Sequence, residues 1–208
     1  MKVFYIDTSS SYLYTGITCD NELLIEKKLC LSHDLSTFTL NEVSKMFNEV
    51  GLEHKDIDKI IVVNGPGSFT GIRIGVTLAK IFAWGLNKRI TTISSLEAMA
   101  KSVEDERLVV PIINARRGAC YASIYDHDKC LLEGEYMTIE KLKLFLVGLG
   151  KEYVFVSNDK FDFHVEEYNP NILRIVNSFK DREDINPHLV NPSYLKLTEA
   201  EERLRGVS

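Results

Sequence analysis

A glycine-rich segment contains the residues of this chain whose types and spacing could bind or transform a small molecule. It reads NGPGSFTGIRIG over residues 64–75. A P-loop reads Gly, four residues, then Gly-Lys-Ser/Thr, but here Gly71 follows Gly65 by six positions and Ile72 stands where the lysine belongs. The dinucleotide fingerprint G-x-G-x-x-G also fails, because its third glycine comes one position late.

The same segment could still bind an anion through its backbone. A Gly-Pro-Gly turn is followed by hydroxyls at Ser68 and Thr70 and by a helix start, whose amides have no partner within the helix. With Arg73 nearby, this pattern indicates a phosphate site. An equally simple interpretation stays open, in which Gly65 and Gly67 only permit the turn and Thr70 caps the helix.

Three strands and a helix precede the glycine segment. The expected strands cover residues 3–6, 13–18 and 23–29, joined by turns of Asp, Thr, Ser and Asn. Apolar residues then recur with a helical period over residues 34–50, and a β-branched run over residues 57–63 is typical of a central strand. The glycine segment therefore follows the carboxyl end of a buried strand.

The elements after it alternate between helix and strand. They are expected to be an apolar helix over residues 72–86, a short helix capped by Ser94 or Ser95, a strand pair within 108–125, a helix over 139–149 and a strand over 153–156. A meander followed by alternating elements indicates an α/β fold with one actin-like (ASKHA, ribonuclease H-like) lobe of mixed sheet. We expect that lobe at residues 1–125 and a smaller, degenerate second lobe with the tail at residues 126–208.

Asp7 follows the first strand, where actin-like ATPases place a carboxylate that faces a metal ion. Capping the next turn is the alternative role for this side chain. By that analogy, the residues expected at a phosphate site are Asp7, Thr8, Gly65, Gly67, Ser68, Thr70 and Arg73.

Composition limits the class of protein. The chain has 208 residues, 45% of them hydrophobic, and a formal net charge of -5. This charge gives no general attraction to nucleic acid, so we expect any nucleic-acid role to be local or to be reached through another subunit, and a free-standing tRNA binder is not expected. No run approaches the ~20 apolar residues of a membrane span and the first residues do not read as a secretory signal, so we expect a cytoplasmic protein without membrane contact.

Residues 64–75 closely resemble the glycine motif of the bacterial TsaB (YeaZ) family. Further matches are DTSS at residues 7–10, SSLEA at 94–98, NARRG at 114–118 and PSYL at 192–195. The resemblance implies a non-catalytic partner of TsaD, the subunit that transfers a threonylcarbamoyl group to the adenosine beside the anticodon of certain tRNAs, with TsaE as an ATPase. It implies no cofactor of its own, a homodimer when TsaD is absent, and leaves ATP or ADP at the subunit boundary open.

The residues themselves agree with a non-catalytic role. The catalytic paralogue holds its metal with two histidines one helical turn apart, but Thr37 stands four residues after His33, so no metal is expected. No histidine partner can be assigned to Ser9, Ser10 or Ser68. A glycoprotease-like metallopeptidase and an independent actin-like ATPase remain the alternatives.

Small residues recur every fourth position on the second long helix. Gly71, Gly75, Ala79 and Ala83 form a smooth ridge that would let another helix approach closely. Since the first long helix also has two apolar stripes, we expect both helices to pack on TsaD or on a second copy. The expected interface residues are Leu35, Phe38, Met46, Gly71, Ile72, Gly75, Val76, Ala79 and Ala83.

Overall fold

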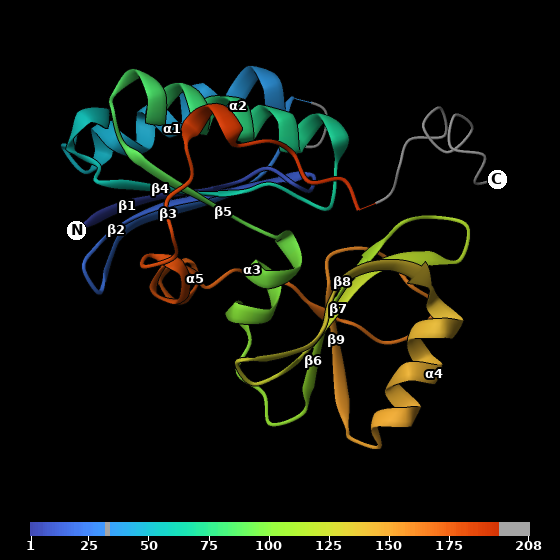
Figure 1. Cartoon of the computed structure of the whole chain (residues 1–208). Helices are drawn as coiled ribbons and strands as arrows, with labels where there is room; N and C mark the ends of the chain where they lie inside the picture. Colours follow the sequence, from blue (N-terminus) through green and yellow to red (C-terminus); the bar gives the residue numbers. More distant parts are fainter. Residues whose placement is uncertain (32–33, 196–208) are drawn as a thin grey trace.

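Two five-stranded sheets form the framework of the protein, seen in a computed structural model that describes residues 1–31 and 34–195 (Figure 1). The first sheet has the order β3-β2-β1-β4-β5 and the second the order β10-β9-β6-β7-β8. Counted from their first strands, β1 and β6, the two sheets have the same strand order. The molecule therefore has two lobes of related topology.

The first sheet is the mixed sheet that the sequence predicts. Its strands are β1 (Lys2–Asp7), β2 (Tyr12–Cys19), β3 (Glu22–Cys30), β4 (Lys59–Val63) and β5 (Arg89–Ile93). The first three pair antiparallel as a meander, whereas β4 and β5 add in parallel. All five residues of β4 are buried, as expected for a continuous β-branched strand. The sheet therefore has an antiparallel meander on one side of β1 and parallel strands on the other.

Two long helices cover one face of this sheet (Figure 1). They are α1 (Leu35–Glu49) and α2 (Phe69–Gly85), with the short 3₁₀ helix η1 (His54–Asp56) between them along the chain. Apolar side chains of both helices meet the sheet in one core, which includes Val43, Met46 and Ile72. Ser68 caps α2 by accepting a hydrogen bond from the Gly71 amide at 3.2 Å.

The second sheet begins earlier than expected. It consists of β6 (Leu108–Asn114), β7 (Ala119–Asp126), β8 (Lys129–Thr138), β9 (Tyr153–Ser157) and the two-residue β10 (Glu166–Glu167), with α4 (Ile139–Leu149) packed on it. The strand pair within residues 108–125 thus belongs to the second lobe. This corrects the boundary expected after residue 125, because β6 pairs in parallel with β9 and not with any strand of the first sheet.

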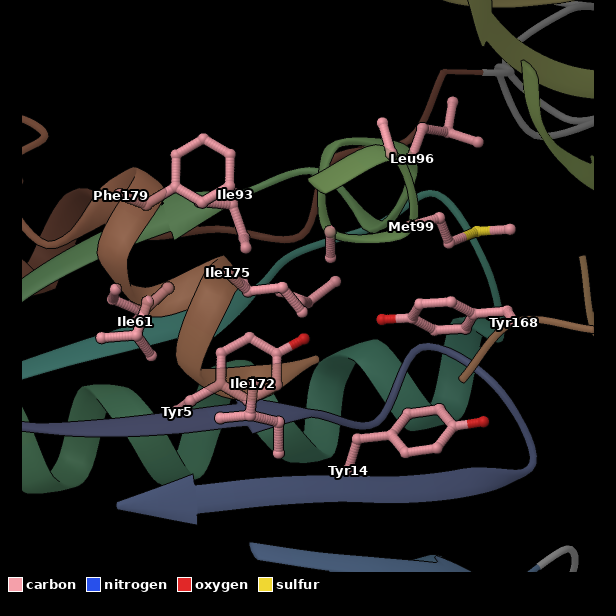
Figure 2. Packing of buried hydrophobic residues seen from close by; sticks show 14 of the residues in the cluster. Tyr5, Tyr14, Ile61, Ile93, Leu96, Met99, Tyr168, Ile172, Ile175 and Phe179 are labelled. Atoms are coloured by element: carbon pink, nitrogen blue, oxygen red, sulfur yellow. The ribbon is translucent and has the colours of Figure 1, made fainter. Parts of the chain in front are cut away.

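A shared core joins the lobes. The helices α3 (Ser95–Ser102) and α5 (Ile172–Phe179) lie between the sheets (Figure 1). Their apolar side chains pack together with Tyr5 and Ile61 of the first sheet and with Val109 of the second. Figure 2 shows Tyr5, Tyr14 and Tyr168 in this cluster beside Ile172 and Ile175. One apolar core therefore connects the two lobes.

The end of the described chain returns to the first lobe. Residues 185–195, which include the 3₁₀ helix η2 (Pro187–Leu189), form a strap along α2. The Ile185 amide donates to the Ile90 carbonyl at 2.8 Å, and Val190 enters the core beneath α2. These residues were expected in the second lobe and instead belong to the first. Residues 196–208, the last part of the expected tail, lie outside the described residues.

Candidate functional site

The glycine segment and the turn after β1 are locked against each other. The Thr8 hydroxyl donates to the Gly71 carbonyl at 2.6 Å and accepts from the Gly75 amide at 3.1 Å. A Cβ atom at Gly71 would lie 2.0 Å from the Thr8 carbonyl oxygen, and one at Gly67 would lie 2.2 Å from the Ser9 carbonyl oxygen. These glycines are thus required because the chain's own backbone approaches them closely.

The contact between the glycine segment and the turn after β1 occupies backbone amides that could otherwise bind an anion. The Ser68 amide donates to the Ser9 carbonyl at 2.6 Å, and the Gly71 amide donates to the Ser68 hydroxyl. The Gly75 amide is bound to Thr8, as described above. The first turn of α2 is therefore partly satisfied from within the chain, which favours the packing interpretation of the glycine segment over the phosphate interpretation. The cap is Ser68, however, and not Thr70 as that interpretation expected, because Thr70 already lies within α2.

A cleft of about 590 Å³ opens between the lobes beside this turn. Its lining is rich in hydroxyl, amide and carboxyl groups from both lobes: Asp7, Ser9, Ser10, Ser11, Ser68, Ser95, Asn114, Arg116, Ser157, Asn158 and Asp159. Tyr121, Tyr168 and Met99 add apolar surface. The turn between β6 and β7, at residues 114–118, faces the turn after β1, so the cleft can bind a polar ligand by hydrogen bonds from two sides.

Asp7 is the buried acid of this cleft. Its side chain is 2% exposed, and its Oδ1 accepts a hydrogen bond from the Ser9 amide at 2.7 Å. Burial raises the pKa of the Asp7 carboxyl above its ordinary value, while the hydrogen bonds from Ser9 oppose that rise. The capping role considered from the sequence is thus present.

A second, apolar hollow lies on the outer side of the helix pair. We call it the α1–α2 groove. It has a volume of about 480 Å³ and is lined by Ser36, Thr39, Leu40, Phe69, Thr70, Arg73, Ile74, Thr77, Leu78 and Ile81. Leu40 is 51% exposed and Ile81 is 57% exposed, and Trp84 on the last turn of α2 is 68% exposed. These are large apolar side chains without cover from the described part of the chain.

Phe69 lies where the cleft and the groove meet, because it lines both. The Arg73 guanidinium carbon lies 3.7 Å from the centre of the Phe69 ring, and the Tyr194 ring stacks on Phe69 at 5.2 Å. Arg73 Nε also donates to the Tyr194 hydroxyl at 2.9 Å. Cation–π and stacking contacts thus hold the end of the strap at this junction.

The residues expected at a phosphate site separate in the structure. Asp7, Gly67 and Ser68 line the cleft, whereas Thr70 and Arg73 line the groove. The Thr8 side chain is sealed against α2, and Gly65 is buried under the strap. They do not form one site. Asn114, Arg116 and Asn158 of the second lobe complete the cleft, and only the NARRG motif indicated two of them in advance.

Most of the residues expected at a partner interface are not accessible to a partner in this structure. Of the nine residues, only Phe38 is exposed, at 43%. The other eight are buried in the chain's own core: Leu35, Met46, Gly71, Ile72, Gly75, Val76, Ala79 and Ala83. The ridge of small residues is already buried, because α2 lies close against the turn after β1 and against the sheet. The outward side instead carries Leu40, Phe69 and Ile81.

Neither a metal site nor a membrane span is found in the described part of the chain. Within 1–31 and 34–195, no three or more His, Cys, Asp or Glu side chains gather closely enough to hold a metal ion. His33, the histidine that opens the expected first helix, lies outside these ranges. No helix among the described residues has the length and hydrophobicity to cross a membrane.

Comparison with known proteins identifies the family. Residues 32–142 match the family model described as TsaD, tRNA N6-adenosine threonylcarbamoyltransferase. The chain is 32% identical, over 97% of its length and 96% of the relative, to the tRNA threonylcarbamoyladenosine biosynthesis protein TsaB of Bacillus subtilis. The chain belongs to the TsaB (YeaZ) family. Its place is thus among tRNA threonylcarbamoyladenosine biosynthesis proteins, as the glycine motif indicated.

Other members agree in sequence and in fold. The TsaB protein of Escherichia coli is 28% identical over 62% of this chain and 57% of its own length. YeaZ from Pseudomonas aeruginosa superposes with a TM-score of 0.76 at 16% identity, covering 93% of this chain and 99% of the other. At that identity the superposition shows a common fold, and both lobes are included in it.

Proposed function

We propose that this protein is a non-catalytic scaffold subunit that docks on TsaD through the α1–α2 groove. In this proposal TsaD transfers the threonylcarbamoyl group to the N6 amine of the adenosine next to the anticodon, in tRNAs that read codons starting with A. TsaE joins the same complex, and tRNA reaches this chain only through it. The complex works in the cytoplasm, and in the absence of TsaD the groove binds a second copy.

The observation that carries the docking proposal is the gathering of exposed apolar side chains on one layer of the molecule. The α1–α2 layer and the strap beside it hold Phe38, Leu40, Phe69, Ile81, Trp84, Leu189 and Tyr194, each at least 43% exposed. Burying a side chain of this size stabilises a complex by about 1.5–3 kcal/mol. An apolar surface of this kind is typical of a protein interface.

The state of the cleft supports a non-catalytic role. At the start of α2, the Ser68 amide is bound by the Ser9 carbonyl and the Gly71 amide by the Ser68 hydroxyl, which leaves fewer donors for a phosphate. Asp7 is buried and hydrogen-bonded to Ser9, where it stabilises the turn. ATP or ADP at the subunit boundary is a separate proposal, supported by Phe69, which would place a partner seated in the groove beside the mouth of the cleft.

The docking proposal is tested by substituting an exposed residue of the groove. Ile81→Arg should weaken binding of the TsaD homologue at least thirtyfold in isothermal titration calorimetry, because a charge would replace an apolar contact. Leu144→Arg on α4 is the matched control, since Leu144 is 73% exposed on the other lobe. Equal binding by the two variants would refute the groove as the docking surface.

Two further measurements separate this proposal from the rival activities. Metal analysis of the purified chain tests the metallopeptidase, and calorimetry with ATP and magnesium tests the independent ATPase. Stoichiometric metal with peptide hydrolysis, or tight ATP binding with turnover by the isolated chain, would refute the non-catalytic role. ADP binding only by the complex with TsaD would support a nucleotide site at the subunit boundary.

A further inference from the structure

The strap delivers the chain to one end of the α1–α2 groove. At the far end of α2, Lys80 donates to the His188 carbonyl at 3.3 Å and the rings of Trp84 and His188 lie 6.0 Å apart. At the near end, Tyr194 stacks on Phe69. The strap thus runs antiparallel to α2, and residue 196 follows directly from the residues that hold the groove's first turn.

The sequence that follows has an apolar stripe. Residues 196–208 read KLTEAEERLRGVS, with apolar side chains at Leu197, Ala200, Leu204 and Val207. These intervals of three, four and three residues are those of one face of a helix, and five of the other positions are Glu or Arg. Such a pattern suits a surface that is apolar and open to solvent on one side.

The groove matches this segment in character and in length. Its lining from Phe69 to Ile81 spans twelve residue steps of α2, or about 18 Å at the helical rise. Thirteen residues at the same rise extend over about 20 Å. The interlobe cleft fits less well, since its lining consists mainly of hydroxyl, amide and carboxyl groups that would be buried without partners against an apolar stripe.

We propose that residues 196–208 bind in the α1–α2 groove of the same molecule when no partner occupies it. Because the segment is tethered at the groove, its effective concentration is of the order of 1 mM. An intrinsic dissociation constant of about 0.1 mM would then keep the groove about nine-tenths occupied. Only the competition with TsaD rests on the proposed function, and it would weaken the apparent affinity for TsaD about tenfold.

The test is intramolecular photo-cross-linking in the full chain. A photoreactive amino acid replaces Leu204, the dilute protein is irradiated, and mass spectrometry locates the adduct. We expect adducts on groove residues such as Leu40, Thr77 or Ile81. Leu40→Arg should abolish them, whereas Leu144→Arg should leave them unchanged. Adducts on another surface, adducts only between molecules, or no adduct would each overturn the proposal.

A second measurement separates failure of this inference from failure of the docking function. Leu204→Glu in the full chain should release the groove and strengthen TsaD binding about tenfold, while Glu202→Gln should not. Groove adducts together with unchanged TsaD affinity would uphold binding of the segment and count against the groove as the TsaD surface. Absent groove adducts together with loss of TsaD binding in Ile81→Arg would overturn binding of the segment and uphold the groove as the TsaD surface.

Discussion

The two sides of α2 differ in the size of their side chains, and the difference runs against the usual expectation for an interface helix. The inner side carries Gly71, Gly75, Ala79 and Ala83, and all four are buried. The outer side carries large apolar residues such as Ile81 and Trp84, which are exposed. Small residues permit close approach, but here the neighbour that approaches is the turn after β1. The surface that α2 offers to a partner is therefore formed by its large exposed side chains and not by its small ones.

The largest expected effect is on the inner side. Gly71→Val should lower the free energy of unfolding by about 4 kcal/mol or more, because its Cβ atom would lie 2.0 Å from the Thr8 carbonyl oxygen. Urea unfolding followed by circular dichroism measures this. Gly85→Ala is the control on the same helix, since no atom lies within 4 Å of its added methyl group. A native-like Gly71→Val chain would contradict the described contact.

A substitution on the outer side of α2 is expected to have a large effect on partner binding and little effect on stability. Trp84→Ala should weaken partner binding by about 2 kcal/mol, as for a large aromatic side chain that becomes buried at an interface. Its free energy of unfolding should change by less than about 1 kcal/mol, because the side chain is 68% exposed. Titration with TsaD and urea unfolding give the two values. If stability falls and binding does not, the roles assigned to the two sides are reversed.

A smaller effect is expected where the lobes are joined. The Asn158 side-chain amide donates to the Tyr14 hydroxyl at 2.7 Å, which links the end of β9 to β2. Asn158→Ala should therefore lower the free energy of unfolding by about 1 kcal/mol. Tyr14→Phe and the double variant complete a mutant cycle. Strict additivity of the two single substitutions would show that this bond contributes nothing.

The smallest expected effect is the pH dependence of the contribution that Asp7 makes to stability. Because burial raises the pKa of Asp7 in the folded chain, the folded state binds a proton more readily than the unfolded state. The native chain should lose stability relative to Asp7→Asn as pH rises from the ordinary pKa of 3.8 through the raised value. Urea unfolding at a series of pH values tests this sign. If the stability of the native chain minus that of Asp7→Asn stays constant or increases as pH rises, the raised pKa of Asp7 is contradicted.

Much of the architecture could be predicted from local patterns. The meander, the buried strand β4 and both long helices follow from periodicity and turn residues. The lobe boundary could not, because the strand pair of β6 and β7 has the same local pattern whichever sheet it joins. Pairing between β6 and β9 is decided by contacts more than 40 residues apart in sequence.

The candidate sites were harder to predict for a related reason. A helical wheel shows that α2 is apolar on several sides, but it does not show which side meets the sheet. The hydrogen bonds of Thr8 to Gly71 and Gly75 decide this, and they join residues that are distant along the chain. Likewise Asp7 and Asn158 enter one cleft only because two separate sheets face each other.

The core shared by α3, α5 and both sheets has a consequence for the whole molecule. Side chains of both lobes, among them Tyr5 and Val109, belong to one apolar cluster together with Ile175 of α5. Figure 2 shows Tyr5 and Ile175 within it. Domains that open and close usually meet across a small and polar interface. This protein should therefore unfold as a single cooperative unit, and the slowest-exchanging amides of both sheets should share one protection free energy in native-state hydrogen exchange. The width of the cleft is then set when the chain folds, so a ligand must fit it as it stands.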